Sequence, residues 1–195
     1  MNNKIANRTF HQLSKYWYHG TTSEYFSSLS SNIDLSRCKE YTDFGKGFYL
    51  TSNFTQASKH AENRATFEGE PVVFVYELNI ANLKEAYTGK FWVEMNSLWS
   101  DFIYLNRSQQ EKFTHGYDFV YGGVADGKIH TLIKNRDKGI ISSETFFQSI
   151  CKYPNYDQLS IHNQEIIDYN IINNVGVVNA YEKGKQYNGI QNFGS

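Results

Sequence analysis

The sequence predicts an α+β protein built around a split sheet. Short apolar strands and short helices follow one another in irregular order, which does not fit the regular βαβ alternation of a doubly wound nucleotide-binding fold. Aromatic residues make up 16% of the chain, with 15 Tyr and 14 Phe, and such rings favour strands that fill a core or line a cleft for flat ligands. A chain of 195 residues is long enough for a single domain over 1–195 with its own core.

The first half of the chain predicts strands separated by helices. Strands are expected at 15–19, 47–51 and 72–78, the last (VVFVYEL) giving the strongest signal for a buried strand. A short helix is expected within 22–31, and a loop over 36–45. Asn53 or Thr55 is expected to cap a longer helix that runs to about Phe67, with Ala57 and Ala61 on one stripe.

The second half predicts a similar mixture. A helix is expected at 96–104, a strand at 117–124, helices at 127–138 and 143–150, and a short strand at 159–162. Asp126 is the expected N-cap of the first helix of that pair, and Ser142 or Ser143 of the second. The apolar run 166–172 fits either a helix or a strand, and the Gly- and Asn-rich residues 180–195 are expected to form a loose tail.

Composition excludes several classes of protein. The net charge of −1 provides no overall basic field for nucleic acid or anionic membranes. The two cysteines, Cys38 and Cys151, and the six histidines lack metal-ligand spacing, so no metal site is expected. Sparse cysteine fits a reducing compartment, and no apolar run suits a signal peptide or a membrane span. We therefore expect a cytoplasmic protein that makes no contact with a membrane.

Three segments concentrate residues with chemical potential. They are Tyr18–Thr21 (YHGT), Asp43–Thr51 (DFGKGFYLT) and Asp157–His162 (DQLSIH). Each is a weak signal alone, since a histidine before a glycine is usually a strand-end residue. Gly45 and Gly47 predict a tight loop whose backbone can approach a ligand or another strand.

In this order the segments resemble the ADP-ribosyltransferase superfamily, in its diphtheria-toxin and poly(ADP-ribose) polymerase branch. That branch carries a His-Tyr-Glu trio on three separate strands. The closest resemblance, over about residues 15–170, is to a small bacterial family, DUF3990. The segment GKGFYLT is the most specific part, being similar to GKGIYFA of the polymerases. The resemblance implies split, mostly antiparallel sheets with an NAD cleft between them, peripheral helices and no metal.

The resemblance also implies a role for each matched residue. His19 would hydrogen-bond the adenosine-side ribose of NAD, and Gly20 would present backbone groups to the nicotinamide carboxamide, with the Thr21 hydroxyl adding one more bond. Tyr49 would stack on the nicotinamide ring. These residue types suit cleavage of the nicotinamide–ribose bond, which passes through an oxocarbenium-like centre as glycoside hydrolysis does.

The rest of the expected NAD site departs from the family pattern or is less specific. A second ring usually lies eleven residues after the tyrosine, where this chain has His60, so Phe44 or Phe67 is an alternative far wall of the nicotinamide slot. Arg37 and Lys46 are candidate partners of the NAD pyrophosphate, or else solvated loop charges.

Gln158 takes the place of the usual glutamate. A glutamine keeps the hydrogen bond to the ribose but lacks the charge and cannot act as a general base. A single transfer is therefore favoured over polymer synthesis. Proton removal falls to Asp157, to Asp126 or to the acceptor itself, and Asp126 has an alternative role as a helix cap.

The loop 150–157 lies where this superfamily places its substrate-recognition loop. Lys152, Tyr153 and Tyr156 are the expected acceptor-binding residues. Tyrosines beside a lysine suit stacking on a base with a phosphate contact, and they suit a protein surface equally well.

The resemblance predicts an NAD-dependent mono-ADP-ribosyltransferase toxin of a toxin–antitoxin or phage-defence module, with an antitoxin protein as partner. The acceptor is a macromolecule, with nucleic acid slightly favoured over protein. Three alternatives are an NAD glycohydrolase toxin, an inactive module that binds NAD or ADP-ribose, and a structural protein in which the motifs coincide by chance.

Overall fold

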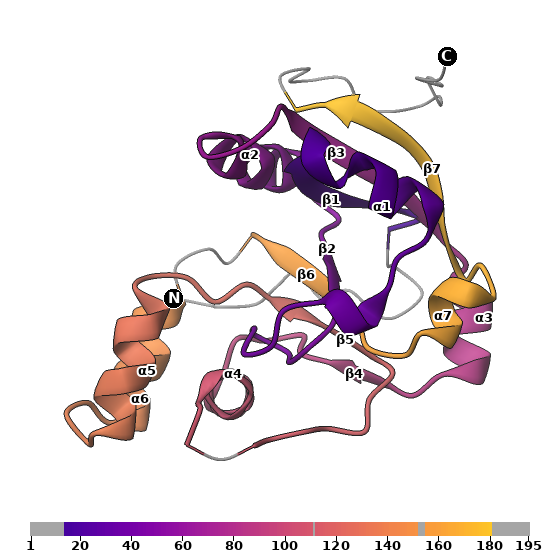
Figure 1. Ribbon diagram of the computed structural model, residues 1–195. Helices are drawn as coiled ribbons and strands as arrows, with labels where there is room; N and C mark the ends of the chain where they lie inside the picture. The colour runs from indigo at the N-terminus through magenta and orange to yellow at the C-terminus, as the bar shows by residue number, and fades with distance from the viewer. Residues whose placement is uncertain (1–13, 111, 152–154, 181–195) are drawn as a thin grey trace.

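The computed structural model describes residues 14–110, 112–151 and 155–180, and it contains two sheets (Figure 1). The strands are β1 (Tyr16–Thr22), β2 (Phe48–Leu50), β3 (Pro71–Leu78), β4 (Gly89–Phe91), β5 (Phe119–Gly123), β6 (Asp157–Ile161) and β7 (Ile172–Asn179). One sheet has the order β1-β3-β7 and the other β2-β6-β5-β4. Every pairing is antiparallel except β4 with β5. The predicted α+β class and mostly antiparallel pairing are confirmed.

The helices are α1 (Phe26–Ser31), α2 (Phe54–Ala65), α3 (Ile80–Ala86), α4 (Ser97–Arg107), α5 (Ile129–Asp137), α6 (Ser143–Ile150) and α7 (Glu165–Asp168). Two predicted caps are confirmed, since the Asn53 side chain caps α2 and the Ser142 side chain caps α6. The prediction that Asp126 caps α5 is wrong. Gly127 has a φ of 110°, a backbone conformation that a helix cannot include, so α5 begins only at Ile129.

The sequence did not predict three elements, α3, β4 and β7. The run 166–172 divides between α7 and the first residue of β7, and β7 continues through Asn173 and Asn174. Asparagine is depleted in strands, but β7 is an edge strand that pairs along the whole of β3, and that buried strand supplies the partner. Residues 181–195, most of the predicted loose tail, lie outside the described residues.

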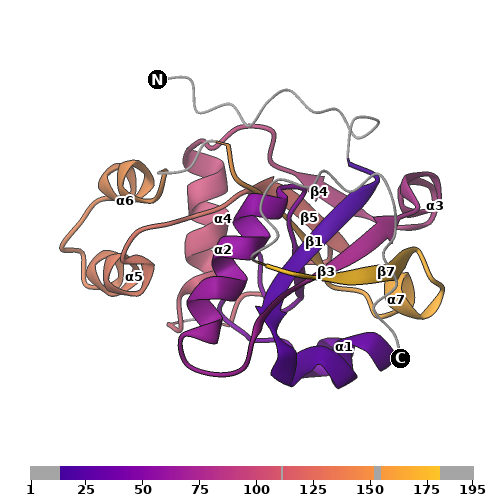
Figure 2. The ribbon, with the colours of Figure 1, turned by 90° about the horizontal axis from the view of Figure 1, so that it is seen from above.

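The main core lies between the two sheets. Trp17, Phe74 and Tyr76 come from the three-stranded sheet and meet Phe48, Leu159 and Ile161 of the four-stranded sheet. Helix α2 covers the other face of the three-stranded sheet, as Figure 2 shows from above. Helices α4, α5 and α6 form a second apolar cluster with Val120 of β5, on the outer face of the four-stranded sheet. Both faces of the four-stranded sheet are therefore packed.

Candidate functional site

Strand β1 meets Thr51, the residue directly after β2, at one isolated bridge, and no further pairing joins β1 to β2, which leaves a fork in the split sheet. At the bridge, Tyr18 N donates to Thr51 O at 2.8 Å and Thr51 N donates to Tyr18 O at 2.9 Å. A continued ladder would next join Gly20 to Tyr49, because hydrogen-bonded pairs recur at every second residue. Instead, the Tyr49 carbonyl accepts from Nδ1 of His19 at 2.7 Å. The histidine side chain takes the place of a backbone donor and leaves the backbone edge of Gly20 facing the fork.

The contact with Tyr49 fixes the protonation of His19. A carbonyl only accepts, so Nδ1 carries the proton and Nε2 is left as an acceptor, without a hydrogen-bond partner in the described part of the chain. Burial lowers the pKa of His19 to about 4, with the charges of His60 and Arg64 acting in the same direction. The ring, which packs 4.7 Å from that of Phe48, is therefore neutral at physiological pH and can accept a hydrogen bond from a hydroxyl.

Gly20 lies against helix α2. A Cβ atom at this position would come within 1.9 Å of the Ala57 carbonyl oxygen, so any side chain would push the helix away. Glycine is thus required for close packing, quite apart from any ligand. Thr21 is 2% exposed and projects from the opposite face of β1, because successive strand residues alternate. Its predicted bond to a ligand remains a prediction.

The loop before β2 holds the Tyr49 side chain. The Tyr49 hydroxyl accepts from Phe44 N and donates to Gly45 O, both at 2.8 Å, and it lies 2.8 Å from Thr42 Oγ1. Burial raises the pKa of Tyr49, so the phenol stays neutral. Phe44 stacks on the Tyr49 ring with centroids 6.5 Å apart and has no exposed surface. Phe44 therefore supports the tyrosine from behind and does not present a wall to a ligand.

Two histidines fasten the same loop to the rest of the sheet. Nε2 of His115 donates to Phe44 O at 2.7 Å, and Nδ1 of His162 donates to Lys46 O at 2.9 Å. Between these anchors the chain turns at Gly45, whose φ of 85° lies in the left-handed region that favours glycine. The predicted tight loop that leads into the Tyr49 strand is thus present.

Tyr49 and Gln158 project from the same face of the four-stranded sheet. Tyr49 pairs directly with Ser160, and Gln158 lies two residues before Ser160 on β6. Nε2 of Gln158 donates to Asp43 Oδ2 at 2.7 Å and to Gly123 O at 2.9 Å. His19 joins this pair through the Tyr49 carbonyl, while its ring packs on Phe48. That all three side chains line one cleft stays a prediction.

Asp157 projects from the other face of β6 and is fully engaged in hydrogen bonds. Its Oδ1 accepts from Thr51 Oγ1 at 2.8 Å and from Ser52 N at 2.9 Å. Its Oδ2 accepts from Ser52 Oγ at 2.5 Å and from Tyr121 OH at 3.2 Å. A carboxylate that is 4% exposed and held in this way joins β6 to the end of β2. These contacts describe a structural role and do not support the predicted general base.

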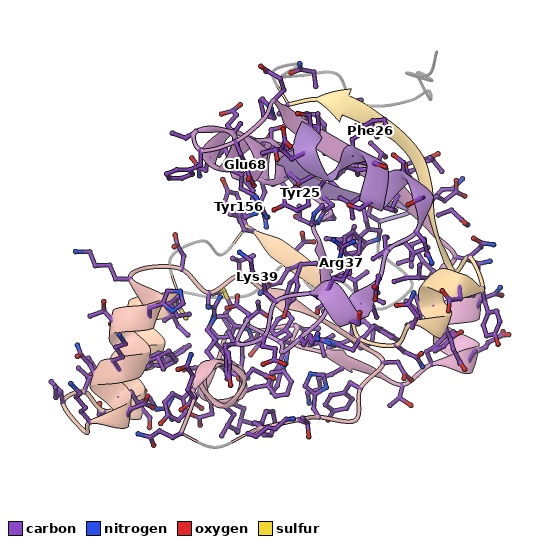
Figure 3. All side chains as sticks on the ribbon, in the orientation of Figure 1. Tyr25, Phe26, Arg37, Lys39, Glu68 and Tyr156 are labelled. Carbon is purple, nitrogen blue, oxygen red and sulfur yellow. The ribbon has the colours of Figure 1, made fainter. Side chains whose placement is uncertain are left out.

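Positive groups gather where α2 approaches the loop after α1. Arg37 and Lys46, the predicted pyrophosphate partners, are exposed. Desolvation and the charges of Arg64 and Lys39 lower the pKa of His60, so these three groups lie within electrostatic range of one another. Figure 3 shows Tyr156 and Lys39 below α2, with Arg37 to their right, below α1. This cluster adds two residues that the sequence analysis missed, Lys39 and Arg64.

Two aromatic candidates, Phe67 and Tyr156, lie at different places relative to α2. Phe67 lies beyond the end of α2 and is 88% exposed, and its predicted role as a far wall of the slot stays a prediction. Tyr156 lies against α2, where its hydroxyl accepts from Lys59 Nζ at 3.2 Å. The predicted acceptor residues Lys152 and Tyr153 lie outside the described residues.

Asp43 is the main site residue that sequence reasoning missed. Its carboxylate accepts from Arg107 Nε at 2.6 Å, Gln158 Nε2 at 2.7 Å and Ala125 N at 3.1 Å. The position of Asp43 directly before Phe44 and Gly45 indicates only a loop residue. Its partner Arg107 is 64 residues away along the chain. Only the fold brings the two together, so the sequence held no signal for their pairing.

The described residues provide neither a cluster of metal ligands nor a membrane-spanning helix. Over residues 14–110, 112–151 and 155–180, no group of three or more His, Cys, Asp or Glu side chains is arranged to hold a metal ion. No helix in the same ranges is both long enough and apolar enough to cross a membrane.

Comparison with known proteins places the chain in a family. The model of the family described as "Protein of unknown function (DUF3990)" matches residues 16–171. No curated protein and no solved structure matches the chain significantly. The family match begins at β1 and ends just before β7, so it includes the fork, the loop before β2 and β6. Since it spans most of the 195 residues, the chain belongs to the DUF3990 family.

Proposed function

We propose that this protein is an NAD-dependent mono-ADP-ribosyltransferase with an ADP-ribosyltransferase fold. The observation that supports the proposal most strongly is the fork between β1 and β2. There the Tyr49 carbonyl accepts from the His19 side chain instead of from Gly20 N, so the backbone N–H and C=O of Gly20 have no partner on β2. A primary carboxamide such as that of nicotinamide is complementary to this edge, because it pairs one donor and one acceptor with a backbone N–H and C=O.

In this proposal the neighbouring side chains hold the remainder of NAD. The Tyr49 ring, fixed by its hydroxyl and backed by Phe44, stacks on the nicotinamide. Neutral His19 accepts from a ribose hydroxyl through Nε2. The cations Arg64 and Lys39 beside His60, together with the exposed Arg37 and Lys46, provide a positive field for the pyrophosphate.

The proposed reaction breaks the bond between nicotinamide nitrogen and ribose carbon. The bonding electron pair leaves with the nicotinamide, and positive charge develops on the ribose, as in glycoside hydrolysis. Gln158 accepts a hydrogen bond from the ribose 2′-hydroxyl, and the acceptor then forms the new bond to the same carbon and loses its proton. The hydrogen bonds of Asp157 leave proton removal to the acceptor or to Asp126.

We further propose that the acceptor is a macromolecule, with nucleic acid favoured over protein. Tyr156, directly before β6, and Lys59 of α2 form a positively charged pair, with the Lys59 amine 3.2 Å from the Tyr156 hydroxyl and 5.9 Å from the ring centroid. Such a pair suits a base and its phosphate. The free cysteines Cys38 and Cys151 fit action in the reducing cytoplasm. We also propose that the enzyme is a toxin of a toxin–antitoxin or phage-defence module, in which an antitoxin protein protects the cell that makes it.

The proposal is tested by incubating the full chain with NAD labelled in its adenylate part and total cell lysate. The products are then divided between nuclease and protease treatment. We expect nicotinamide release together with label on a macromolecule that nuclease degrades. Label that only protease removes would show that the acceptor is a protein. Nicotinamide release without labelled macromolecule would identify an NAD glycohydrolase, and NAD binding without release would identify an inactive binding module.

Matched variants make the assay specific. Tyr49→Ala removes the stacking ring, and we expect it to abolish nicotinamide release. Tyr169→Ala is the control, because Tyr169 is 66% exposed and lies in none of the site contacts. Nicotinamide release by Tyr49→Ala at the wild-type rate would contradict the proposal.

A further inference from the structure

The amide nitrogen of Gln158 uses both of its protons. One is donated to Asp43 Oδ2 at 2.7 Å and the other to Gly123 O at 2.9 Å. The amide oxygen has no hydrogen-bond partner among the residues that the structure describes. Because Gln158 is only 8% exposed, water does not readily replace these protein contacts, and the amide is held in one orientation.

A flipped amide would be strongly unfavourable. It would place Oε1 against a carboxylate oxygen and a backbone carbonyl oxygen, both of which only accept hydrogen bonds. Burial of two unmade hydrogen bonds costs roughly 1–3 kcal/mol for each group. The Asp43 carboxylate therefore selects the orientation in which Gln158 presents an acceptor away from Asp43.

Asp43 is itself held firmly. Arg107 Nε donates to its Oδ1 at 2.6 Å, and Ala125 N donates to its Oδ2 at 3.1 Å. The carboxylate is 3% exposed, while the Arg107 side chain is 18% exposed. A hydrogen bond to a buried carboxylate is shorter and about twice as strong as one between neutral groups. Such a bond also polarises the donor, which raises the negative charge on the amide oxygen.

We propose that Asp43 is the positioning residue of Gln158, fixing its amide oxygen toward the ribose and adding negative charge to it. This inference depends on the proposed function for its catalytic meaning, although the contact itself does not. The pair explains how a neutral glutamine stabilises positive charge on the ribose. The negative charge belongs to Asp43, which hydrogen-bonds to Gln158, and the amide of Gln158 is the group that touches the ribose.

The inference makes a counterintuitive prediction for Gln158→Glu. A glutamate would place a second carboxyl group about 2.7 Å from Asp43. When ionised it repels Asp43 and has no proton to donate to Asp43 or to Gly123 O, so the site should be impaired until a proton is taken up at lower pH. Asp43→Asn in the same chain should relieve the repulsion, because the asparagine amide can donate to the new carboxylate, although the amide then no longer accepts from Ala125 N.

The test is a double-mutant cycle measured as nicotinamide release from NAD. We expect Gln158→Glu to lower kcat about 100-fold near neutral pH, as a misplacement of roughly 1 Å does, with partial recovery as the pH is lowered. Asp43→Asn alone should lower kcat about tenfold with little change in KM, since charge is lost from the transition state. The double variant should exceed Gln158→Glu by at least about tenfold. If Asp43 merely ties the loop to the strand, the double variant will be no better than the poorer single variant, which overturns the proposal.

A readout without NAD separates this inference from the proposed function. In ¹⁵N-labelled protein, the side-chain amide signals of Gln158 should be well dispersed, exchange slowly and shift in Asp43→Asn. Asp101→Asn is the control, since Asp101 also pairs with an arginine at 2.6 Å but lies on α4 away from Gln158. If the Gln158 amide signals shift in Asp43→Asn but the wild-type chain releases no nicotinamide, the proposed function is wrong and the positioning of Gln158 by Asp43 still holds. Signals that do not respond would overturn the positioning, whatever the activity.

Discussion

The two faces of the four-stranded sheet differ in what they do. The inner face carries Phe48, Leu50, Leu159 and Ile161, which are all buried in the core between the sheets, together with the Asp157 network. The outer face carries Tyr49 and Gln158, which hydrogen-bond to the loop residues Phe44 and Asp43. Strand residues alternate between faces, so adjacent residues in the sequence have opposite roles. Changes on the inner face should reduce stability, and changes on the outer face should reduce activity.

The largest expected effects come from the adjacent rings Phe48 and Tyr49. Phe48→Ala should lower the free energy of unfolding by about 3–5 kcal/mol, the usual cost of deleting a buried ring. Tyr49→Ala should lower nicotinamide release at least about 100-fold, because the leaving group is misplaced. Denaturant unfolding and NAD kinetics per folded molecule measure the two effects. Equal activity loss per folded molecule in both variants would remove the distinction between the faces.

The polar neighbours Asp157 and Gln158 provide a second pair. Asp157→Asn replaces a carboxylate oxygen that accepts from two donors with an amide that donates, and it should cost about 3 kcal/mol of stability. The folded fraction should still release nicotinamide. Gln158→Ala removes two buried hydrogen bonds and should also lower stability, but its folded fraction should lose the reaction. An Asp157→Asn variant that is stable and inactive would restore Asp157 as a general base.

Acid should weaken the contacts that hold the fork and its loop together. Burial lowers the pKa of His19 and of His162 to about 4, from an ordinary value of 6.5. Near His162, the positive charge of His115 lowers the pKa while Asp118 opposes that effect. Each native ring favours the neutral form, so its contribution to stability is complete above pH 6.5 and is lost as the pH falls toward 4. The loss is at most about 1.4 kcal/mol per pH unit for each histidine.

Urea unfolding at a series of pH values measures this loss. In His162→Gln the slope between pH 6.5 and 4 should become shallower, because one of the two groups no longer titrates. A slope that stays the same in that variant would show that other groups dominate acid sensitivity.

The smallest effect is expected at the rim of the site. Tyr156→Ala should lower transfer to the macromolecule about tenfold, the value of one base-stacking contact, and leave NAD hydrolysis unchanged. Adding Tyr153→Ala should lower transfer further. Comparison of labelled acceptor with free nicotinamide, with Tyr169→Ala as control, measures the split. Equal loss of both activities would assign Tyr156 to NAD binding.

Local signals in the sequence were sufficient for elements that have their own caps or strong apolar runs. Helix α2 was predictable from Asn53, and β3 from its run of apolar residues. Strand β7 was not, because its pairing comes from β3 and its own residues include Asn173 and Asn174. The early part of α5 was mispredicted, since a cap residue cannot act across the left-handed backbone of Gly127.

In the candidate site, too, local signals identify residues within motifs but not their distant partners. His19, Tyr49 and Gln158 could be proposed because they fall within short motifs whose order resembles a known family, and their roles stay predictions. Asp43 was not, since its partners Arg107 and Gln158 lie 64 and 115 residues away. The separation of Asp157 from Gln158 required the strand boundaries, because only a strand that already includes residue 157 places the two side chains on opposite faces.

The most direct test of the central claim is an experimental structure of the protein bound to NAD. The account predicts that the nicotinamide carboxamide lies about 2.7–3.2 Å from both Gly20 N and Gly20 O. The ring should lie against Tyr49, and the adjacent ribose 2′-hydroxyl should donate to Gln158 Oε1. NAD bound away from the fork, or saturating NAD that leaves the fork empty, would contradict the account.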